Sequence, residues 1–240
     1  KIIFDNLKTL VGALLIAILI RSLIIQPFYI PSSSMEPTLL VGDRIFVTKY
    51  TYGYSKHSFP FSPNLFEKRL FSKIPQQGDL VVFKTPADNR TDYIKRLIGL
   101  PGDEIQFKNS ELFINEKKII RVETKANEPI RCGSYNIRSN VFIETLPNGV
   151  KHLVSYNSEG TLQNTKKFLV PENHYFLMGD NRDCSKDSRF LNDVGYVINQ
   201  NLVGKAKIVF FSNDTQKGSL FKFWNLQNSF RFDRTFKKLQ

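Results

Sequence analysis

The apolar run at residues 9–25 constrains the fold of this chain more than any other feature, because few environments accommodate it. Only Arg21 and Ser22 interrupt the run. A helix of roughly 17 residues is at the short limit for crossing the roughly 30 Å hydrocarbon core of a bilayer. An arginine near its end can extend toward the lipid headgroups. The run therefore predicts a transmembrane helix within residues 1–26.

A removable secretory leader has a similar basic start and apolar centre, but it ends in a small-x-small cleavage site. No such site precedes Gln26 and Pro27, so we expect a retained anchor. Lys1 and Lys8 precede the run, and no further lysine follows before Lys49. This bias favours a cytoplasmic amino terminus, with the chain after Pro27 on the outer side of the membrane.

The formal net charge of +12 predicts an anionic partner. The lysines and arginines are scattered along the chain, without a basic helix, a zinc-finger spacing or an RNA-binding signature. We therefore expect membrane lipid, and no nucleic acid, as the anionic partner.

Short apolar runs separated by turn residues follow the anchor, a pattern typical of antiparallel β proteins. Residues 113–119 look like a hairpin, and the more polar residues 104–172 look like an inserted lobe. The fold class we predict is mostly β, with an N-terminal helix. The predicted strands lie at residues 44–49, 79–84, 93–98, 104–107, 112–114, 141–145, 152–156, 167–170, 174–178 and 202–211.

Three consecutive serines, Ser32, Ser33 and Ser34, lie between Pro31 and Pro37. The prolines fix their own φ and push the preceding residues toward extended geometry, so the serines should occupy a stiff, irregular segment. Such a segment could present a reactive hydroxyl. An ordinary serine-rich linker has the same composition, and this stretch alone does not separate the two interpretations.

Further motifs along the chain favour the reactive hydroxyl. The sequence reads P-S-S-S-M at residues 31–35, G-D-R-I-F-V-T-K at residues 42–49, Y-I-K-R at residues 93–96 and G-D-N-R-D-C-S-K-D-S-R at residues 179–189. Together and in this order, they resemble the motifs of bacterial type I signal peptidases. The resemblance extends from about Arg21 to Arg189.

The resemblance implies a Ser/Lys catalytic dyad. Matching the motifs position by position makes Ser34 the nucleophile and Lys95 the general base. Ser32 would donate its hydroxyl to the oxyanion, together with the backbone N–H of Ser34. Ser33 stands where most family members have Gly, so the local backbone of this chain is open to question.

The last of these motifs, at residues 179–189, supplies supporting residues. By resemblance, Ser185 orients the catalytic lysine, and Asp187 and Arg189 form an ion pair. Cys184 occupies a position where the family more often has Asn.

The family also implies a substrate and an architecture. Its members cleave signal peptides from exported preproteins after small residues, as in Ala-X-Ala, and need no metal or organic cofactor. The implied catalytic β domain comprises residues 27–103 and 173–240, interrupted by a second β-rich domain at residues 104–172. The implied location is the bacterial cytoplasmic membrane, with the catalytic domain on the periplasmic face. Residues expected in or beside the substrate pockets are Phe28, Ile30, Met35, Leu39, Tyr93 and Ile94.

A lysine acts as a base only when it is neutral. A free lysine has a pKa near ~10.4, so only about one in a few thousand is neutral at pH 7, but burial can lower this pKa by several units. In a strand, Lys95 shares a face with Tyr93 and Leu97, and apolar neighbours make such burial plausible. The histidines are the other candidate bases, and a Ser-His-Asp triad would use His174; the three histidines are His57, His152 and His174.

Two rival functions remain open from the sequence. A self-cleaving, repressor-like Ser/Lys peptidase is disfavoured because the apolar run occupies the place of a DNA-binding domain. A non-catalytic, membrane-anchored module that binds export substrates would not need Ser34, Lys95 and Ser185 together. Cys132 and Cys184 fit neither a metal-site spacing nor a dense disulfide framework, so we expect two free thiols, with a disulfide between them as the less favoured alternative.

Overall fold

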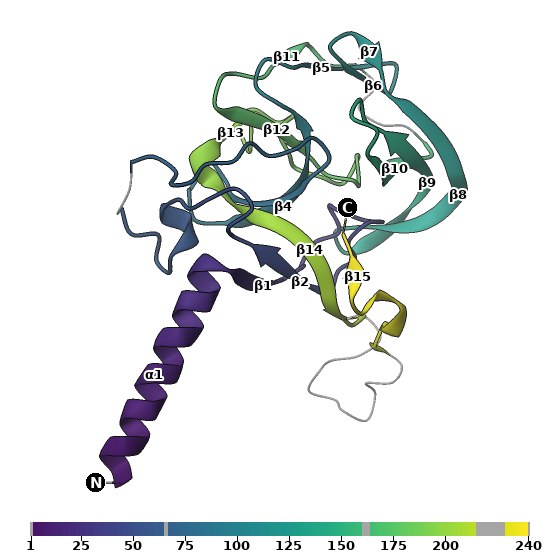
Figure 1. Cartoon of the computed structure of the whole chain (residues 1–240). Helices are drawn as coiled ribbons and strands as arrows, with labels where there is room; N and C mark the ends of the chain where they lie inside the picture. Colours follow the sequence, from purple (N-terminus) through teal and green to yellow (C-terminus); the bar gives the residue numbers. More distant parts are fainter. Residues whose placement is uncertain (1, 65–66, 160–163, 215–228, 240) are drawn as a thin grey trace.

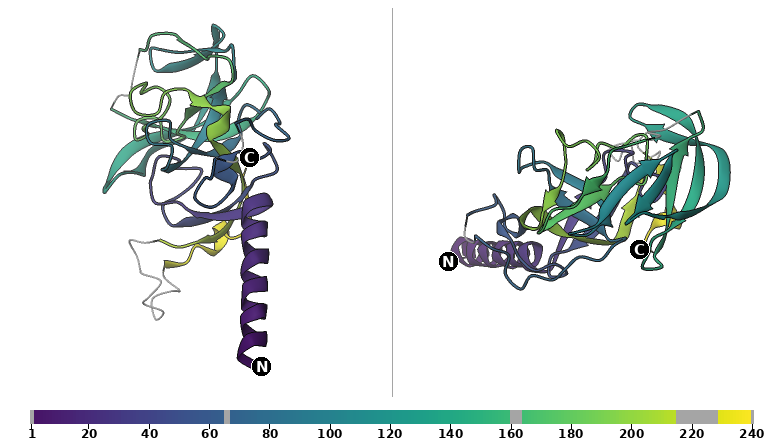
Figure 2. Two further views of the ribbon diagram at one scale, coloured as in Figure 1. Left: turned by 90° about the vertical axis from the view of Figure 1, so that its left-hand side faces the viewer. Right: turned by 90° about the horizontal axis from the view of Figure 1, so that it is seen from above.

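One long helix, α1 (Ile2–Leu23), precedes the β part of the chain. The computed structural model describes residues 2–64, 67–159, 164–214 and 229–239. The helix extends away from the rest of the molecule (Figures 1 and 2), and its apolar side chains are exposed on all sides. Its residues Phe4–Leu23 are long and apolar enough to cross a membrane. The predicted helix is confirmed, although it begins earlier in the chain than the apolar run.

An eight-stranded antiparallel sheet follows the helix. The strand order is β1-β2-β14-β3-β4-β12-β13, and β15 also pairs with β14. The strands are β1 (Ile25–Tyr29), β2 (Asp43–Thr48), β3 (Leu80–Lys84), β4 (Asp92–Gly99), β12 (His174–Met178), β13 (Val197–Ile198), β14 (Leu202–Ser212) and β15 (Lys237–Lys238). Among the described residues, short 3₁₀ helices connect parts of this sheet: η1 (Lys56–Ser58), η2 (Asn199–Asn201) and η4 (Phe232–Arg234). The mostly β, antiparallel fold class is confirmed.

Two smaller sheets lie between β4 and β12 in the chain. One has the order β11-β5-β6-β7 and the other β10-β9-β8. The β8–β9 hairpin lies on the side of the molecule opposite α1 (Figures 1 and 2). The strands are β5 (Glu104–Lys108), β6 (Glu111–Ile114), β7 (Lys117–Lys118), β8 (Ile120–Cys132), β9 (Tyr135–Thr145), β10 (Lys151–Asn157) and β11 (Phe168–Leu169). The pairing of β6 with β7 confirms the predicted hairpin.

The hydrophobic core continues from the large sheet into the smaller ones. Ile98 of β4 and Phe176 and Met178 of β12 belong to the same buried cluster as Ile105 and Phe107 of β5. Packing therefore does not break at either end of the predicted lobe, and its boundaries at residues 104 and 172 stay a prediction.

Candidate active site

The serine segment forms a tight turn between β1 and β2. The N–H of Glu36 donates to the carbonyl of Ser33 at 3.0 Å, and the N–H of Leu39 donates to the carbonyl of Met35 at 2.9 Å. Ser33 does not adopt a left-handed backbone conformation. Its Oγ accepts a hydrogen bond from the N–H of Gly133 at 3.2 Å. A side chain at this position is therefore accommodated and used.

Lys95 reaches Ser34 from β4. Its Nζ lies 2.7 Å from Oγ of Ser34, in hydrogen-bond contact. The Lys95 side chain is only 3% exposed, and Nζ lies 5.3 Å from the centre of the Tyr93 ring. Alternation along the strand explains the arrangement, because Tyr93 and Lys95 lie on one face of β4. The two atoms that a Ser/Lys dyad requires thus meet in a buried place.

Burial controls the protonation of Lys95. Loss of hydration lowers the pKa of its amine to about 8, and this effect outweighs the opposing charges of Asp187 and Asp180. The guanidinium of Arg189 acts in the same direction as burial. With that pKa, about one amine in ten is neutral at pH 7, against about one in a few thousand for a free lysine. The amine can therefore accept a proton near neutral pH.

The loop of residues 179–189 holds the serine turn in place. The backbone N–H of Asn181 donates to the carbonyl of Ser34 at 3.1 Å. The Asn181 side-chain amide donates to the carbonyl of Ser33 at 3.1 Å and to that of Arg131 at 2.8 Å. Sequence reasoning missed this role of Asn181, since all three acceptors are main-chain carbonyl oxygens brought close only by the fold.

Two buried ion pairs lie beside the amine. Asp187 and Arg189 form a bidentate pair with distances of 2.8 and 2.9 Å, and Asp187 also accepts from the N–H of Gly179. Arg96 and Asp180 form a second bidentate pair at 2.8 Å. A buried carboxylate is tolerated only when it is paired, which explains why each aspartate has its arginine.

Ser185 lies next to this network. Its Oγ is buried and makes no hydrogen bond within the described part of the chain, so its orienting role stays a prediction. A Cβ added to Gly179 would come within 2.2 Å of the Ser185 Oγ and 2.5 Å of the Ser34 carbonyl oxygen. Gly179 is therefore required for the close approach of the loop to the serine turn.

Ser32 lies at the exposed edge of the turn. Its Oγ is 3.3 Å from the Oγ of Ser34. The backbone N–H of Ser34 makes no hydrogen bond with any described residue. The Ser32 hydroxyl and the Ser34 N–H thus stay the predicted oxyanion donors.

The signal peptidase model, described as "Signal peptidase, peptidase S26", matches residues 3–211. The chain belongs to the signal peptidase family, peptidase S26. It is therefore a peptidase, and so a hydrolase.

Curated relatives agree with this assignment. The chain is 41% identical to Signal peptidase I of Rickettsia bellii, an alignment that covers 97% of this chain and 84% of the relative. It is 46% identical to Signal peptidase I of Rickettsia typhi, over 82% of this chain and 76% of the relative. A crystal structure of a signal peptidase I from Enterococcus faecalis V583 aligns with a TM-score of 0.33 and 25% identity, over 55% of this chain and 97% of the other.

A cavity of about 400 Å³ opens beside Ser34 and Lys95 in this S26 peptidase. Four of the predicted pocket residues line it, namely Phe28, Ile30, Tyr93 and Ile94. Met35 and Leu39 do not line it, because both are fully buried in the core cluster next to the cavity. Sequence reasoning missed further lining residues, including Ile45, Val82, Cys184 and Lys186.

The expectation of two free thiols is wrong. Cys132, at the end of β8, and Cys184 form a disulfide, with their Cα atoms 5.3 Å apart. The physical reason is the contact of the β8–β9 turn with the serine segment, where Gly133 donates to Ser33 and Asn181 donates to Arg131. The disulfide therefore joins the predicted lobe to the loop of residues 179–189 beside Ser34.

The three histidines contact other groups. Nδ1 of His57 lies 2.9 Å from Oγ of Ser62, and Nδ1 of His174 lies 2.8 Å from the carbonyl oxygen of Glu172. Nε2 of His152 lies 3.4 Å from a carboxylate oxygen of Glu144. Lysine, rather than histidine, is thus the basic group in contact with Ser34.

Proposed function

We propose that this chain removes signal peptides from exported preproteins as a membrane-anchored serine endopeptidase, through a Ser34/Lys95 dyad and an acyl-enzyme. The observation that carries the proposal is the 2.7 Å contact between Nζ of Lys95 and Oγ of Ser34 at a buried site. The family membership supports cleavage of a signal peptide. The roles that individual residues play in each step are part of this proposal.

The reaction begins when neutral Lys95 takes the proton of the Ser34 hydroxyl. Oγ attacks the scissile carbonyl carbon, and the C=O electron pair moves onto oxygen. The resulting ammonium of Lys95 gives its proton to the leaving amine, which departs with the mature protein. Water then gives a proton to Lys95 and attacks the ester carbonyl on Ser34. The Lys95 ammonium returns that proton to the departing Oγ, which releases the signal peptide as a carboxylic acid and restores neutral Lys95 and the Ser34 hydroxyl.

The oxyanion is stabilised by the Ser32 hydroxyl and the Ser34 N–H, neither of which has another acceptor among the described residues apart from the Ser32–Ser34 contact. Such a donor typically contributes ~10²–10³ in rate. In this scheme Ser185 orients the amine, and the Asp187–Arg189 pair fixes the surrounding loop.

The substrate is bound as an added strand. β4 pairs with β3 from residue 92 onward, but its pairing with β12 begins only at Arg96. The described residues leave the second edge of residues 92–95 unpaired, and β1 likewise pairs only with β2. A peptide lying between these edges would gain backbone hydrogen bonds on both sides, beside the cavity at Ser34.

Specificity follows from the lining of that cavity. Apolar side chains of Phe28, Ile30 and Ile94, with the Tyr93 ring, surround a space that suits small aliphatic residues. This supports cleavage after Ala-X-Ala-like sequences, with small residues at the first and third positions before the scissile bond.

Helix α1 serves as the membrane anchor in this proposal. It is apolar and long enough to span a bilayer, and it makes few contacts with the β part. The anchor holds the chain in the bacterial cytoplasmic membrane, and the lysine bias around it puts the catalytic part on the periplasmic face.

The test is cleavage of a purified preprotein by the detergent-solubilised chain, followed by the mobility shift of the product on a gel. Wild type should release the mature protein, whereas Ser34→Ala and Lys95→Ala should each leave the preprotein intact. The product's amino terminus, read by mass spectrometry, should follow a small-X-small sequence.

Two other outcomes would overturn the proposal. Cleavage of the chain itself without cleavage of the preprotein would point to a self-cleaving, repressor-like peptidase. Binding of the preprotein without any cleavage would point to a non-catalytic module. Full activity in either variant would remove that residue from the mechanism.

A further inference from the structure

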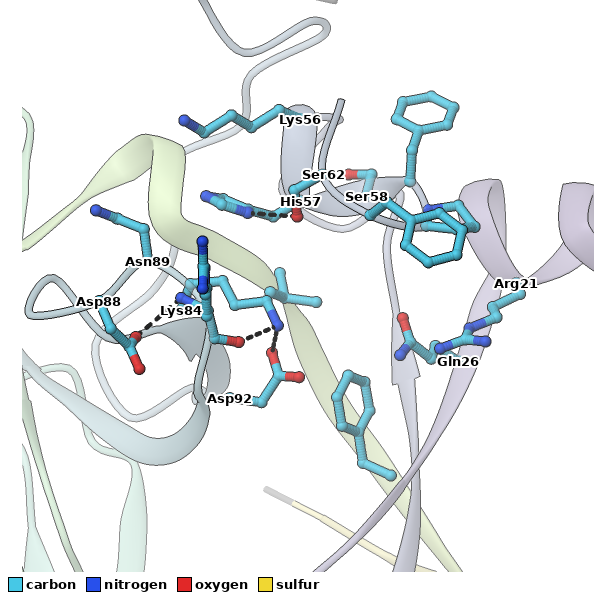
Figure 3. A pocket seen from close by; sticks show the side chains of 16 residues that line it. Arg21, Gln26, Lys56, His57, Ser58, Ser62, Lys84, Asp88, Asn89 and Asp92 are labelled. Atoms are coloured by element: carbon cyan, nitrogen blue, oxygen red, sulfur yellow. Dashed lines mark hydrogen bonds and ion pairs between the residues drawn. The ribbon is translucent and has the colours of Figure 1, made fainter. Parts of the chain in front are cut away.

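A second cavity, of about 530 Å³, lies where α1 joins the β part (Figure 3). Its wall includes Arg21 from the last turn of α1, Gln26 from β1, and Lys56 and His57 from η1. The end of β3 and the loop that follows it complete the wall. Tyr54, near η1, donates from its hydroxyl to the carbonyl of Leu23 at 3.0 Å, which ties this wall to the helix end.

The cavity carries an excess of positive charge. Lys84 is paired with Asp92 at 2.9 Å, and it donates to the carbonyl of Arg90. Asp88 closes its own turn, accepting hydrogen bonds from neighbouring hydroxyl and N–H groups. The other three cations of the wall have no carboxylate partner within the described part of the chain; they are Arg21, Lys56 and Arg90.

His57 adds an unused polar atom to this wall. The side chain is 4% exposed, and its Nε2 has no hydrogen-bond partner among the described residues. Burial and the nearby charge of Lys56 lower the pKa of the ring to about 4, so the imidazole is neutral. When the Ser62 hydroxyl donates to Nδ1, Nε2 carries the proton and is a donor without an acceptor.

Lys49 lies close behind His57. Its side chain is 1% exposed, and Nζ donates to the carbonyl of His57 at 3.4 Å, with no carboxylate in ion-pair range among the described residues. The charges that act on it include those of Asp92 and Arg21, both in the cavity wall. A buried ammonium without a counter-charge is unfavourable, and an anion in the cavity would relieve this.

The position of the cavity identifies the class of anion. Arg21 is at the end of a helix that crosses the bilayer in the proposed function, which is the level of the lipid headgroups. Phe61, in the cavity wall, is fully exposed. Phe71 and Ile74, in the same segment of the chain, are largely exposed. Exposed aromatic and apolar side chains beside cations are typical of a surface that meets the membrane interface.

We propose that this cavity binds the phosphate-bearing headgroup of an anionic phospholipid, held by Arg21, Lys56 and Arg90. The inference rests on the proposed anchoring by α1. The cavity also shares Phe28 and Asp92 with the cavity beside Ser34, so an upstream part of the substrate is the competing occupant. The unpaired cations favour phosphate, because a neutral peptide segment would leave them without a counter-charge.

The test is native mass spectrometry of the full chain in a neutral detergent, with phosphatidylglycerol or phosphatidylcholine added. Wild type should retain one phosphatidylglycerol. The variant Arg21→Gln/Lys56→Gln/Arg90→Gln should bind it on the order of a hundredfold more weakly, at ~1 kcal/mol for each cation. A control variant removes the same charge from exposed lysines of the predicted lobe: Lys117→Gln, Lys125→Gln and Lys166→Gln.

Retention by wild type and the control, but not by the cavity variant, supports the proposal. Equal loss in both variants, or equal retention of phosphatidylcholine by wild type, overturns it. Displacement by inorganic phosphate at the lipid's own concentration would make this a free-phosphate site. Unchanged lipid binding with altered kcat/KM for peptides extended upstream of the cleavage site would assign the cavity to the substrate.

Two controls keep this test separate from the proposed function. The cavity variant should unfold at the wild-type temperature and cleave a short peptide in detergent at the wild-type rate. Ser34→Ala should abolish cleavage and still retain the lipid, so a failure of the dyad would not imitate a failure of the lipid site.

Discussion

Two buried lysines, Lys95 and Lys49, lie in different regions of the molecule, and the pKa of each amine is lowered for the same reason. Burial lowers the pKa of each amine to about 8. Nζ of Lys95 contacts the hydroxyl of Ser34 at 2.7 Å, whereas Nζ of Lys49, within the described part of the chain, hydrogen-bonds only the carbonyl of His57, at 3.4 Å. A depressed pKa makes a lysine available as a base, but only a nucleophile within reach gives it a reaction.

The largest expected difference between the two lysines is in cleavage. Replacing each with methionine removes the amine and keeps much of the volume. Lys95→Met should lower kcat/KM by at least about 10⁴-fold, because removing one member of a catalytic unit disables the unit. Lys49→Met should stay within a few-fold of wild type. Preprotein cleavage rates measure kcat/KM for both variants. Comparable losses in the two variants would contradict the proposed difference between the lysines.

One hydroxyl from each region, Ser32 and Ser62, should differ by a smaller factor in its effect on cleavage. Ser32→Ala removes a proposed oxyanion donor and should lower kcat about 10²–10³-fold with little change in KM. Ser62→Ala removes the hydroxyl beside His57 and should leave kcat unchanged. Steady-state kinetics on a peptide substrate separate kcat from KM. A Ser32→Ala effect confined to KM would mean that Ser32 binds substrate without stabilising the transition state.

Replacing Lys49 should change the stability of the fold rather than the rate of cleavage. Its folded pKa of about 8 is below the unfolded value of 10.5, so the unfolded chain binds more protons between these pH values. The cost of burying the ammonium is therefore complete below pH 8 and disappears as the pH rises toward 10.5. Lys49→Met should raise the free energy of unfolding at pH 7 by roughly 3 kcal/mol, and by much less near pH 10.

Chemical denaturation in detergent without anionic lipid measures this change. The conservative replacement Lys49→Arg serves as the matched control, because arginine stays charged across this pH range and should give no such gain. An equal gain for Lys49→Met at both pH values would show that packing, not charge, determines the effect.

The smallest expected effect is the pH dependence of cleavage. Lys95 must be neutral, so kcat/KM should fall about tenfold for each pH unit below about 8 and level off above it. Lys49→Met should leave this fall in kcat/KM at the same pH, although Lys49 has a similar pKa. If the pH at which kcat/KM falls changes in Lys49→Met, or changes when a histidine is substituted, the assignment of the base to Lys95 would be contradicted.

The sequence predicted the helix and most strands because these depend on local patterns. The apolar run specifies α1, and runs such as residues 79–84 and 202–211 became β3 and β14. It missed β8, whose residues Ile120–Cys132 are largely polar and exposed. It also missed β13 and β15, which are two residues long and exist only through pairing with β12 and β14.

The pairing of Ser34 with Lys95 came from the resemblance to a family, and strand alternation explained which face of β4 carries the lysine. The supporting contacts could not be derived in this way. Asp180 neutralises Arg96 across a long stretch of sequence, and Asn181 binds the serine turn through main-chain atoms. Such contacts depend on how two distant loops are brought together, and no pattern within either loop encodes it.

The Cys132–Cys184 bond has a consequence for the chain's durability. It closes a covalent ring that begins and ends next to the serine turn. A single cut anywhere within that ring would leave both pieces attached to each other, with the serine turn still held from two directions. A nicked molecule would then remain whole on a gel until a reductant separates its two pieces.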